Sequence, residues 1–261
     1  MKKKYYLFLL FVIIIAVGAR IYIHSRSKNN KKGMELIAEG SGQSDAPKVP
    51  DSTENLGTTE LSTETAESTE DYPEYDGEPY IVLDSPPTFS NLSTESYIKL
   101  GELDEHGRCT PAEACLSKDT MPPEGELRGE IGAVRPSGWK QAKYEGVVDS
   151  EPPYLYNRCH MLMWALTGLN AEERNLITGT RYMNVNMTYH ELMVVNYIED
   201  TGNHVMYRVT PVFKDDELLC RGLEMEAQSV EDDGICYHVF YFNVQPGVSI
   251  DYSTGESELE K

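Results

Sequence analysis

Basic residues are scarce in this chain of 261 residues. Lysine and arginine together contribute 23 residues and aspartate and glutamate 43, so the formal net charge is −20 at pH 7. Proteins that bind nucleic acid normally present a basic footprint, because contacts to phosphates dominate their affinity. The overall charge therefore counts against nucleic-acid binding over a broad surface, and a site of that kind would have to be local.

Cysteines are few, and none form the CxxC pairs of a structural zinc site. The five are Cys109, Cys115, Cys159, Cys220 and Cys236. An odd number leaves at least one without a partner in the chain. A bond between Cys109 and Cys115 is an open alternative. A bond between Cys220 and Cys236 is not expected, because a hairpin turning near residue 232 would set Cys236 opposite Ser229.

Long apolar runs are limited to one, at residues 5–19, between the basic start MKKK and Arg20. Its length is long for the core of an export signal and short for a membrane span. We expect residues 1–32 to be a signal or membrane anchor with a basic flank, a retained anchor being preferred. Basic residues on both sides leave the orientation undecided.

Residues 33–79 are rich in Ser, Thr and Glu, as in STENLGTTELSTETAESTE. Such a segment cannot bury enough apolar surface to offset its ordering entropy, which predicts a disordered acidic stalk. Periodic segments separated by turn signals follow, and they predict one folded domain at residues 80–255 with an acidic tail at 256–261.

Within that domain the pattern predicts an α+β fold with an antiparallel sheet core. The expected helix covers residues 183–200 and is capped by Gly202, since Met183, Met187, Val194, Val195 and Ile198 recur near helical spacing. Strands are expected at residues 80–83, 140–148, 154–160, 175–178, 204–213, 218–230 and 235–245. The last two predict a hairpin with one solvated face, because Leu223, Met225 and Ala227 alternate with Glu224, Glu226 and Gln228.

Four polar residues are predicted to meet at the expected helix. Asn184 and Glu191 are seven residues apart, two helical turns, and therefore share a face. His160 ends the expected strand at 154–160, and Arg158 lies on the same side of that strand. An amide and a carboxylate thus face an imidazole and a guanidinium.

These residues resemble the DNA/RNA non-specific endonucleases, whose ββα-metal finger has the signature D-R-G-H followed by an asparagine on the crossing helix. This chain has Asn157-Arg158-Cys159-His160, and then NLITGTRYMNV. The likeness extends to MPPEGELRGEIGAVRPSGW and VMYRVTPVF, and it is greatest to secreted nucleases of Gram-positive bacteria.

The resemblance implies a role for each residue. His160 would be the general base, and Asn184 the single direct protein ligand of Mg²⁺, with Mn²⁺ or another divalent cation as alternatives. Glu191 would hold metal-bound waters. Asn175, Arg158 and Arg181 would contact the scissile phosphate or its neighbours.

Two departures from the signature concern the residues beside Arg158. Asn157 replaces the usual aspartate and Cys159 the usual glycine, which puts the orienting role of the aspartate in doubt. A thiol nucleophile at Cys159 is disfavoured, because neighbouring strand residues face opposite ways.

The charge balance is more favourable near this motif. Residues 128–213 contain eight basic and nine acidic residues, and Arg128, Arg135, Lys140 and Lys143 there stand against Glu130 alone. These four are expected to provide the substrate approach. The predicted function is hydrolysis of phosphodiester bonds in DNA, and in RNA, without sequence specificity.

Such a nuclease would attack the genome of its own cell from the inside. The domain is therefore expected outside the cell, anchored on the outer face or secreted after cleavage. An inactive surface binding module or an adhesin on the same fold remains the alternative.

Overall fold

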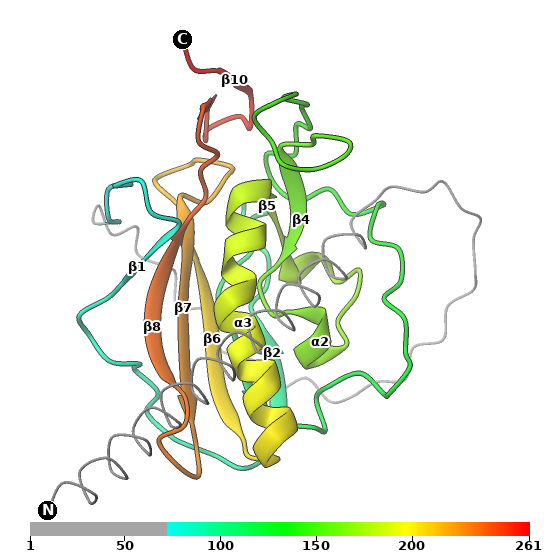
Figure 1. The fold of residues 1–261 in the computed structure, drawn as a ribbon, viewed down its shortest axis with the longest axis vertical. Coiled ribbons are helices and arrows are strands. Elements are labelled where there is room, and N and C mark those ends of the chain that lie inside the picture. Colours follow the sequence, from blue (N-terminus) through cyan, green and yellow to red (C-terminus); the bar gives the residue numbers. More distant parts are fainter. Residues whose placement is uncertain (1–71) are drawn as a thin grey trace, which may run out of the picture. The chain divides into compact units, whose positions relative to one another are not determined.

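The computed structural model of the chain describes residues 72–261, which form a mixed α and β fold (Figure 1). The strands are β1 (Tyr80–Val82), β2 (Tyr97–Leu100), β3 (Ala112–Leu116), β4 (Tyr156–His160), β5 (Leu176–Thr180), β6 (Val205–Val212), β7 (Gly222–Ser229), β8 (Cys236–Phe242), β9 (Val248–Ile250) and β10 (Ser257–Leu259). The helices are α2 (Trp164–Thr167), the short 3-10 helix η1 (Glu173–Asn175) and α3 (Arg181–Thr201).

Six strands form the central sheet in the order β1-β8-β7-β6-β3-β2, and every neighbouring pair is antiparallel. β4 with β5 and β9 with β10 form two separate two-stranded ribbons. Figure 1 shows α3 lying along one face of the central sheet, with the β4–β5 ribbon beside it. The predicted α+β class with an antiparallel sheet core is confirmed.

The core lies between α3 and the sheet. The five apolar helix residues that predicted α3 are all buried, as are Leu223, Met225 and Ala227 on β7. On β8, the Tyr241 hydroxyl lies 2.6 Å from Nδ1 of His190, and the Tyr237 hydroxyl donates to the His190 carbonyl at 3.3 Å. These contacts identify the helix-facing side of the sheet.

The opposite side of the sheet is less open than the alternation predicts. Glu226 is only 4% exposed and His238 6%. The segment between β1 and β2 crosses here, since the Thr88 amide donates to Glu226 at 2.7 Å and Arg208 stacks on Phe89 at 4.8 Å. The predicted hairpin is correct, but the prediction of a solvated face is wrong because this segment covers it.

Two further segments differ from expectation. Residues 140–148 form turns with one isolated bridge, between Lys143 and Tyr154, so the strand predicted there is wrong. Gly146 has a φ of 74°, which interrupts extended structure. At the C-terminus, β10 pairs with β9 inside the segment expected as an acidic tail.

All five cysteines are free; four are buried and Cys236 is exposed. The open alternative of a bond between Cys109 and Cys115 is therefore excluded. Residue Cys236 lies opposite Gln228, one position from the expected partner Ser229.

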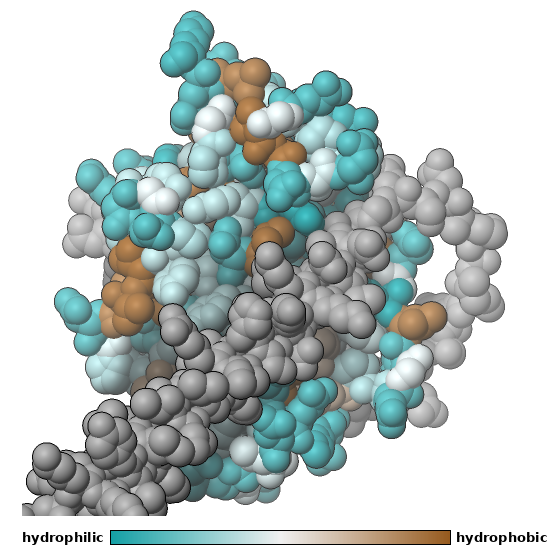
Figure 2. All heavy atoms as spheres, in the orientation of Figure 1, coloured by the Kyte–Doolittle hydropathy of each residue, from teal (hydrophilic) through white to brown (hydrophobic). Residues whose placement is uncertain are grey.

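Apolar side chains on the surface are scattered. In the view of Figure 2 the coloured surface is mostly hydrophilic, with small separate apolar patches. Within residues 72–261 no helix has the length and hydrophobicity needed to cross a membrane. The expected anchor (1–32) and nearly all of the expected stalk (33–79) lie outside the described residues.

Candidate active site

A strand, a second strand and a helix position the predicted residues. β4 and β5 pair antiparallel, with Tyr156 opposite Thr180 and His160 opposite Leu176. Thr180 then caps α3, its Oγ1 accepting a hydrogen bond from the Met183 amide at 3.1 Å. The order of the three elements is the one predicted for a ββα-metal finger.

The helix runs back along the hairpin towards His160. Sγ of Cys159 lies 3.2 Å from Sδ of Met187, two turns into α3. This close approach depends on Gly179, where an added Cβ would lie 2.7 Å from Cβ of Cys159 and 2.9 Å from Cε of Met183. Cys159 is fully buried against the helix, so the disfavoured role as a nucleophile receives no support.

His160 is held in one tautomer by a backbone carbonyl. Its Nε2 lies 2.8 Å from the carbonyl oxygen of Asn170, which can only accept, so Nε2 carries the proton. The lone pair is therefore on Nδ1, where Nη2 of Arg128 donates at 3.1 Å. Burial and the charge of Arg128 lower the pKa of His160 to about 4, so the imidazole is neutral at pH 7.

Arg128 also acts on the carboxyl group of Glu191. Glu191 is 3% exposed. Burial raises its pKa to about 8, and the charge of Arg128 opposes that rise. Burial in turn lowers the pKa of Arg128, while the nearby Cys159 and Glu191 raise it. Imidazole, guanidinium and carboxyl thus form one electrostatically coupled group at the end of β4.

The oxygen donors on α3 suit a hard divalent cation. Asn184 is half-buried in the first turn, and Glu191 is buried two turns later on the same face. A carboxamide and a carboxylate are few ligands, and Mg²⁺ commonly keeps several waters beside one or two protein oxygens. A buried carboxyl also favours a nearby positive charge. The residues present therefore fit a hydrated cation of this class.

Arg158 braces a loop. Its Nε donates to the Val134 carbonyl at 2.6 Å and its Nη2 to the Gly132 carbonyl at 2.9 Å. The guanidinium also stacks on the Trp139 ring at 4.2 Å. A guanidinium has five N–H donors, so these contacts leave others for a phosphate. The phosphate role of Arg158 stays a prediction.

Asn175 is fully buried, and its side-chain amide forms hydrogen bonds to both backbone polar groups of one residue, Leu162. Its Oδ1 accepts from the Leu162 amide at 2.8 Å, and its Nδ2 donates to the Leu162 carbonyl at 2.9 Å. Both ends of the amide thereby hold the turn that follows His160. These contacts assign Asn175 a positioning role, and they lend no support to the predicted phosphate contact.

The remaining basic residues are held by separate partners. Lys140 pairs with Glu256 at 2.9 Å, Lys143 lies over the Tyr154 ring at 4.8 Å, and Arg135 donates to the Val134 carbonyl at 3.1 Å. Arg128, the fourth residue predicted for the substrate approach, is the one in contact with His160. Arg181 is half-buried beside the charge of Asp149, and its Nε has no hydrogen-bond partner within residues 72–261.

Two contacts escaped the sequence reasoning. The first is the Asn170 carbonyl that orients His160; a backbone group has no side-chain signature. The second is the direct contact between Arg128 and His160. The sequence around Arg128, ELRGEIG, predicted only a positive charge near the site. Asn157 stands where the signature has aspartate. Its Oδ1 is buried, and no group within the described residues donates a hydrogen bond to it.

Three solved structures are similar to this chain in fold. NucA from Streptococcus agalactiae with magnesium bound is 23% identical, with a TM-score of 0.59, over 69% of this chain and 86% of that one. Sda1 nuclease with bound zinc is 24% identical, with a TM-score of 0.58, over 70% and 96%. An extracellular endonuclease is 19% identical, with a TM-score of 0.50, over 71% and 100%. At these identities the likeness establishes a shared fold.

The family itself follows from the sequence profile. The profile described as DNA/RNA non-specific endonuclease matches residues 89–231, which is more than half of the chain and includes the hairpin, α3 and Arg128. This protein therefore belongs to the DNA/RNA non-specific endonuclease family.

Proposed function

We propose that the protein is an extracellular, metal-dependent endonuclease that hydrolyses phosphodiester bonds of DNA, and of RNA, without sequence specificity. Membership of the endonuclease family makes the chain a nuclease. The observation that carries the finer proposal is the orientation of His160, whose Nε2 donates to the Asn170 carbonyl and thereby places the lone pair on Nδ1.

In this proposal Nδ1 of His160 accepts the proton of the attacking water. The carbonyl of Asn170 holds the ring while Nε2 keeps its proton, so the imidazole becomes a cation without turning. Asn175 keeps the following turn in place through Leu162. Burial and Arg128 keep the imidazole neutral, and therefore able to accept a proton, before the reaction.

Asn184 and Glu191 would hold the cation, Asn184 directly and Glu191 through water. When bound, Mg²⁺ or a similar ion supplies Lewis-acid stabilisation of the charge that develops on the phosphate and leaving oxygens. Of the similar structures, NucA has a bound magnesium ion and Sda1 nuclease a bound zinc ion. We propose Mg²⁺ for this chain, with Mn²⁺ or another divalent cation as alternatives.

Arg128 would change partner during the reaction. It donates to the nitrogen that must receive the proton, so it has to leave Nδ1 before water can bind there. A phosphate oxygen carries charge and is a stronger acceptor for a guanidinium than an imidazole is. Substrate binding would thus draw Arg128 onto the phosphate and uncover the base. Arg158 and Arg181 would add positive charge nearby.

Plasmid digestion by the full chain tests the proposal. We expect cutting with Mg²⁺, none with EDTA, and a loss of at least about a hundredfold for His160→Ala, because a general base contributes that much or more. His106→Ala is the control, since His106 pairs with Asp216 outside this site. Equal cutting by His160→Ala would remove His160 from the mechanism. An RNA transcript in the same assay tests the wider substrate range.

An inactive surface binding module is the second candidate. It is favoured by Asn157 and Cys159, which depart from the family signature, and by the internal contacts of Arg158. A filter-binding assay separates the two readings. Retained DNA binding with no cutting by the unmodified chain, at any divalent cation tested, would support the binding module and overturn the proposed hydrolysis.

The proposed location outside the cell rests on the basic and apolar start of the sequence. One of the similar structures is that of an extracellular endonuclease. Protease digestion of intact cells that express the full chain tests the location. Loss of the domain from intact cells, or its recovery from the medium, would agree with the proposal, and full protection inside intact cells would contradict it.

A further inference from the structure

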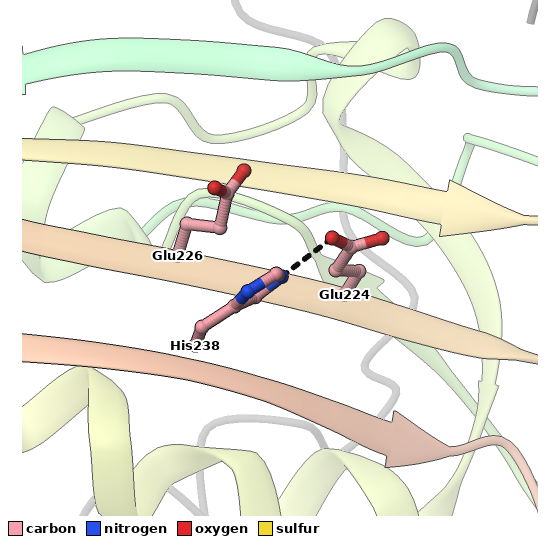
Figure 3. Close-up of side chains that lie close together, drawn as sticks. All are labelled: Glu224, Glu226 and His238. Atoms are coloured by element: carbon pink, nitrogen blue, oxygen red, sulfur yellow. Dashed lines mark hydrogen bonds and ion pairs between the residues drawn. The ribbon is translucent and has the colours of Figure 1, made fainter. Parts of the chain in front are cut away.

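Outside the active site, one group of ligand side chains converges. Within residues 72–261, Glu224, Glu226 and His238 form the one cluster of three or more His, Cys, Asp or Glu residues whose ligand atoms lie within 4.8 Å of one another. Figure 3 shows both carboxylates on β7 and the imidazole on β8, on one face of the sheet, with the His238 ring directed at Glu224. They lie on the sheet face opposite α3, so the sheet separates them from His160 and Asn184.

His238 has the orientation of a metal-ligating imidazole. Its Nδ1 lies 2.9 Å from the carbonyl oxygen of Ser85, which can only accept, so Nδ1 carries the proton. Its Nε2 faces Oε1 of Glu224, 2.5 Å away. Either a proton on Nε2 or a metal ion that binds both atoms satisfies this contact, so the two compete for the site. Metal-bound histidines typically donate their other ring N–H to a carbonyl in this way.

The surroundings supply excess negative charge. Glu113, Arg208, Glu226 and His238 lie opposite one another in register on β3, β6, β7 and β8. Arg208 pairs with both Glu113 at 2.7 Å and Glu226 at 2.9 Å. With Glu224, three carboxylates thus stand against the guanidinium of Arg208 and the ammonium of Lys99, which lies opposite Glu113 on β2. The row keeps an excess of carboxylates, which a bound cation would offset.

The ligand set selects a class of ion. One imidazole nitrogen and two carboxylate oxygens are the donors of His and Glu zinc sites, whereas Mg²⁺ prefers oxygen donors alone. Oε1 of Glu226 accepts from both the amide and the hydroxyl of Thr88, whereas Oε2 accepts from Arg208 alone, so one lone pair of Oε2 remains to bind an ion. Glu224 is half-buried, which gives the ion a route in from solvent.

We propose that Glu224, Glu226 and His238 form a second cation site, separate from the active site, that binds a zinc-like divalent ion. Ser85 and Thr88 hold two of the three ligands from the segment between β1 and β2. The bound ion fastens this covering segment to the sheet. Its role is structural, because the sheet separates it from the reacting groups.

Metal titration of the full chain tests the site. The starting protein is the metal-free Asn184→Ala variant, in which the proposed active-site ligand is removed. We expect one Zn²⁺ per chain, a rise in thermal stability on binding, and the visible absorption of tetrahedral coordination with Co²⁺ as the probe. Adding His238→Gln should weaken Zn²⁺ binding at least about tenfold and abolish the Co²⁺ absorption.

His204→Gln is the matched control, because His204 forms a similar pair with Glu231, with Nδ1 2.6 Å from Oε1, outside the cluster. It should bind Zn²⁺ as the starting protein does. Glu224→Gln provides a second test should His238→Gln fail to fold, since Glu224 is half-buried and its loss should weaken Zn²⁺ equally. Unchanged affinity in Glu224→Gln, or no Zn²⁺ uptake by Asn184→Ala, would overturn the proposal. Plasmid cutting with Mg²⁺ is read separately, in a chain that keeps Asn184, and should survive His238→Gln there.

Discussion

Nη2 of Arg128 lies 3.1 Å from Nδ1 of His160, the ring nitrogen that holds the lone pair. A cation thereby covers the atom that the proposed reaction needs as a base. Together with burial, the contact keeps the imidazole neutral by lowering its pKa, and it also blocks water from the same atom. Arg128 therefore couples the protonation state of His160 to anion binding, because an anion that binds the guanidinium can draw Arg128 away from the imidazole.

The pH dependence of cutting should report this contact. Burial and Arg128 lower the pKa of His160 to about 4, so the basic form persists above that pH and the acid limb of kcat/KM should lie well below pH 6.5. In Arg128→Gln one lowering cause is lost, so the limb should move towards neutral pH while the maximal rate falls. Arg135→Gln should leave the limb in place. An acid limb that stays put in Arg128→Gln would contradict the coupling.

Glu191→Gln should change how stability depends on pH. The pKa of Glu191 is raised from 4.5 to about 8 by burial, so the folded state binds more protons than the unfolded state between these values. The contribution of Glu191 is present below pH 4.5 and is lost as pH rises towards 8. Glu191→Gln should lack this loss and be more stable near pH 8 by roughly 1–4 kcal/mol. Urea unfolding across this pH range, in metal-free buffer, measures it.

Two buried histidines make folding stability depend on pH in the opposite direction. Burial lowers the pKa values of both His160 and His190 to about 4, so they contribute stability above pH 6.5 that is lost as pH falls towards 4. Both remain in Glu191→Gln, so the difference between the two proteins isolates Glu191. Parallel stability curves for the two proteins would show that the pKa of Glu191 is not raised in the folded chain.

Asn175→Ala distinguishes a positioning residue from a phosphate ligand. The substitution removes two hydrogen bonds and leaves the buried amide and carbonyl of Leu162 without partners, which should cost about 1–3 kcal/mol of folding stability. Asn186→Ala is the control, because its single bond to the Tyr182 carbonyl lies on the half-buried side of α3. A loss of activity with unchanged thermal stability would instead favour phosphate contact.

Gly179→Ala should loosen the packing of the hairpin on α3. Its new Cβ would meet Cys159 and Met183 at 2.7 and 2.9 Å, which should lower stability by about 1–3 kcal/mol. Gly132→Ala is the matched control, because an added Cβ there has no neighbour within 4 Å in the described residues. Equal melting temperatures for the two variants would show that the hairpin and α3 tolerate a wider separation.

The sequence predicted local elements well. α3 was found because its buried residues recur at helical spacing, and its observed C-terminal cap is the expected Gly202, with a φ of 75°. β2 and β3 were missed because they are short, and because β3 pairs with β6 across almost a hundred positions of sequence. Residues 140–148 were predicted as a strand from their turn signals, but only one bridge forms there.

The site was predicted less completely than the fold. Residue types and spacing brought out His160, Asn184 and Glu191, because each sits at the end of a strand or on one helix face. The hydrogen-bond partners of Arg158 and Asn175 could not be predicted in the same way. Both are held by backbone groups, of Gly132 and Val134 in one case and Leu162 in the other, which any residue could supply.

The free thiols have a consequence for how the chain matures. Cys109, Cys115, Cys159 and Cys220 are packed as small apolar residues inside the fold, and Cys236 has no bonded partner. Folding of this domain therefore requires no oxidant and no disulfide isomerase. Denatured, fully reduced protein should regain its native structure in the presence of dithiothreitol, so the redox state of its surroundings does not decide whether it folds.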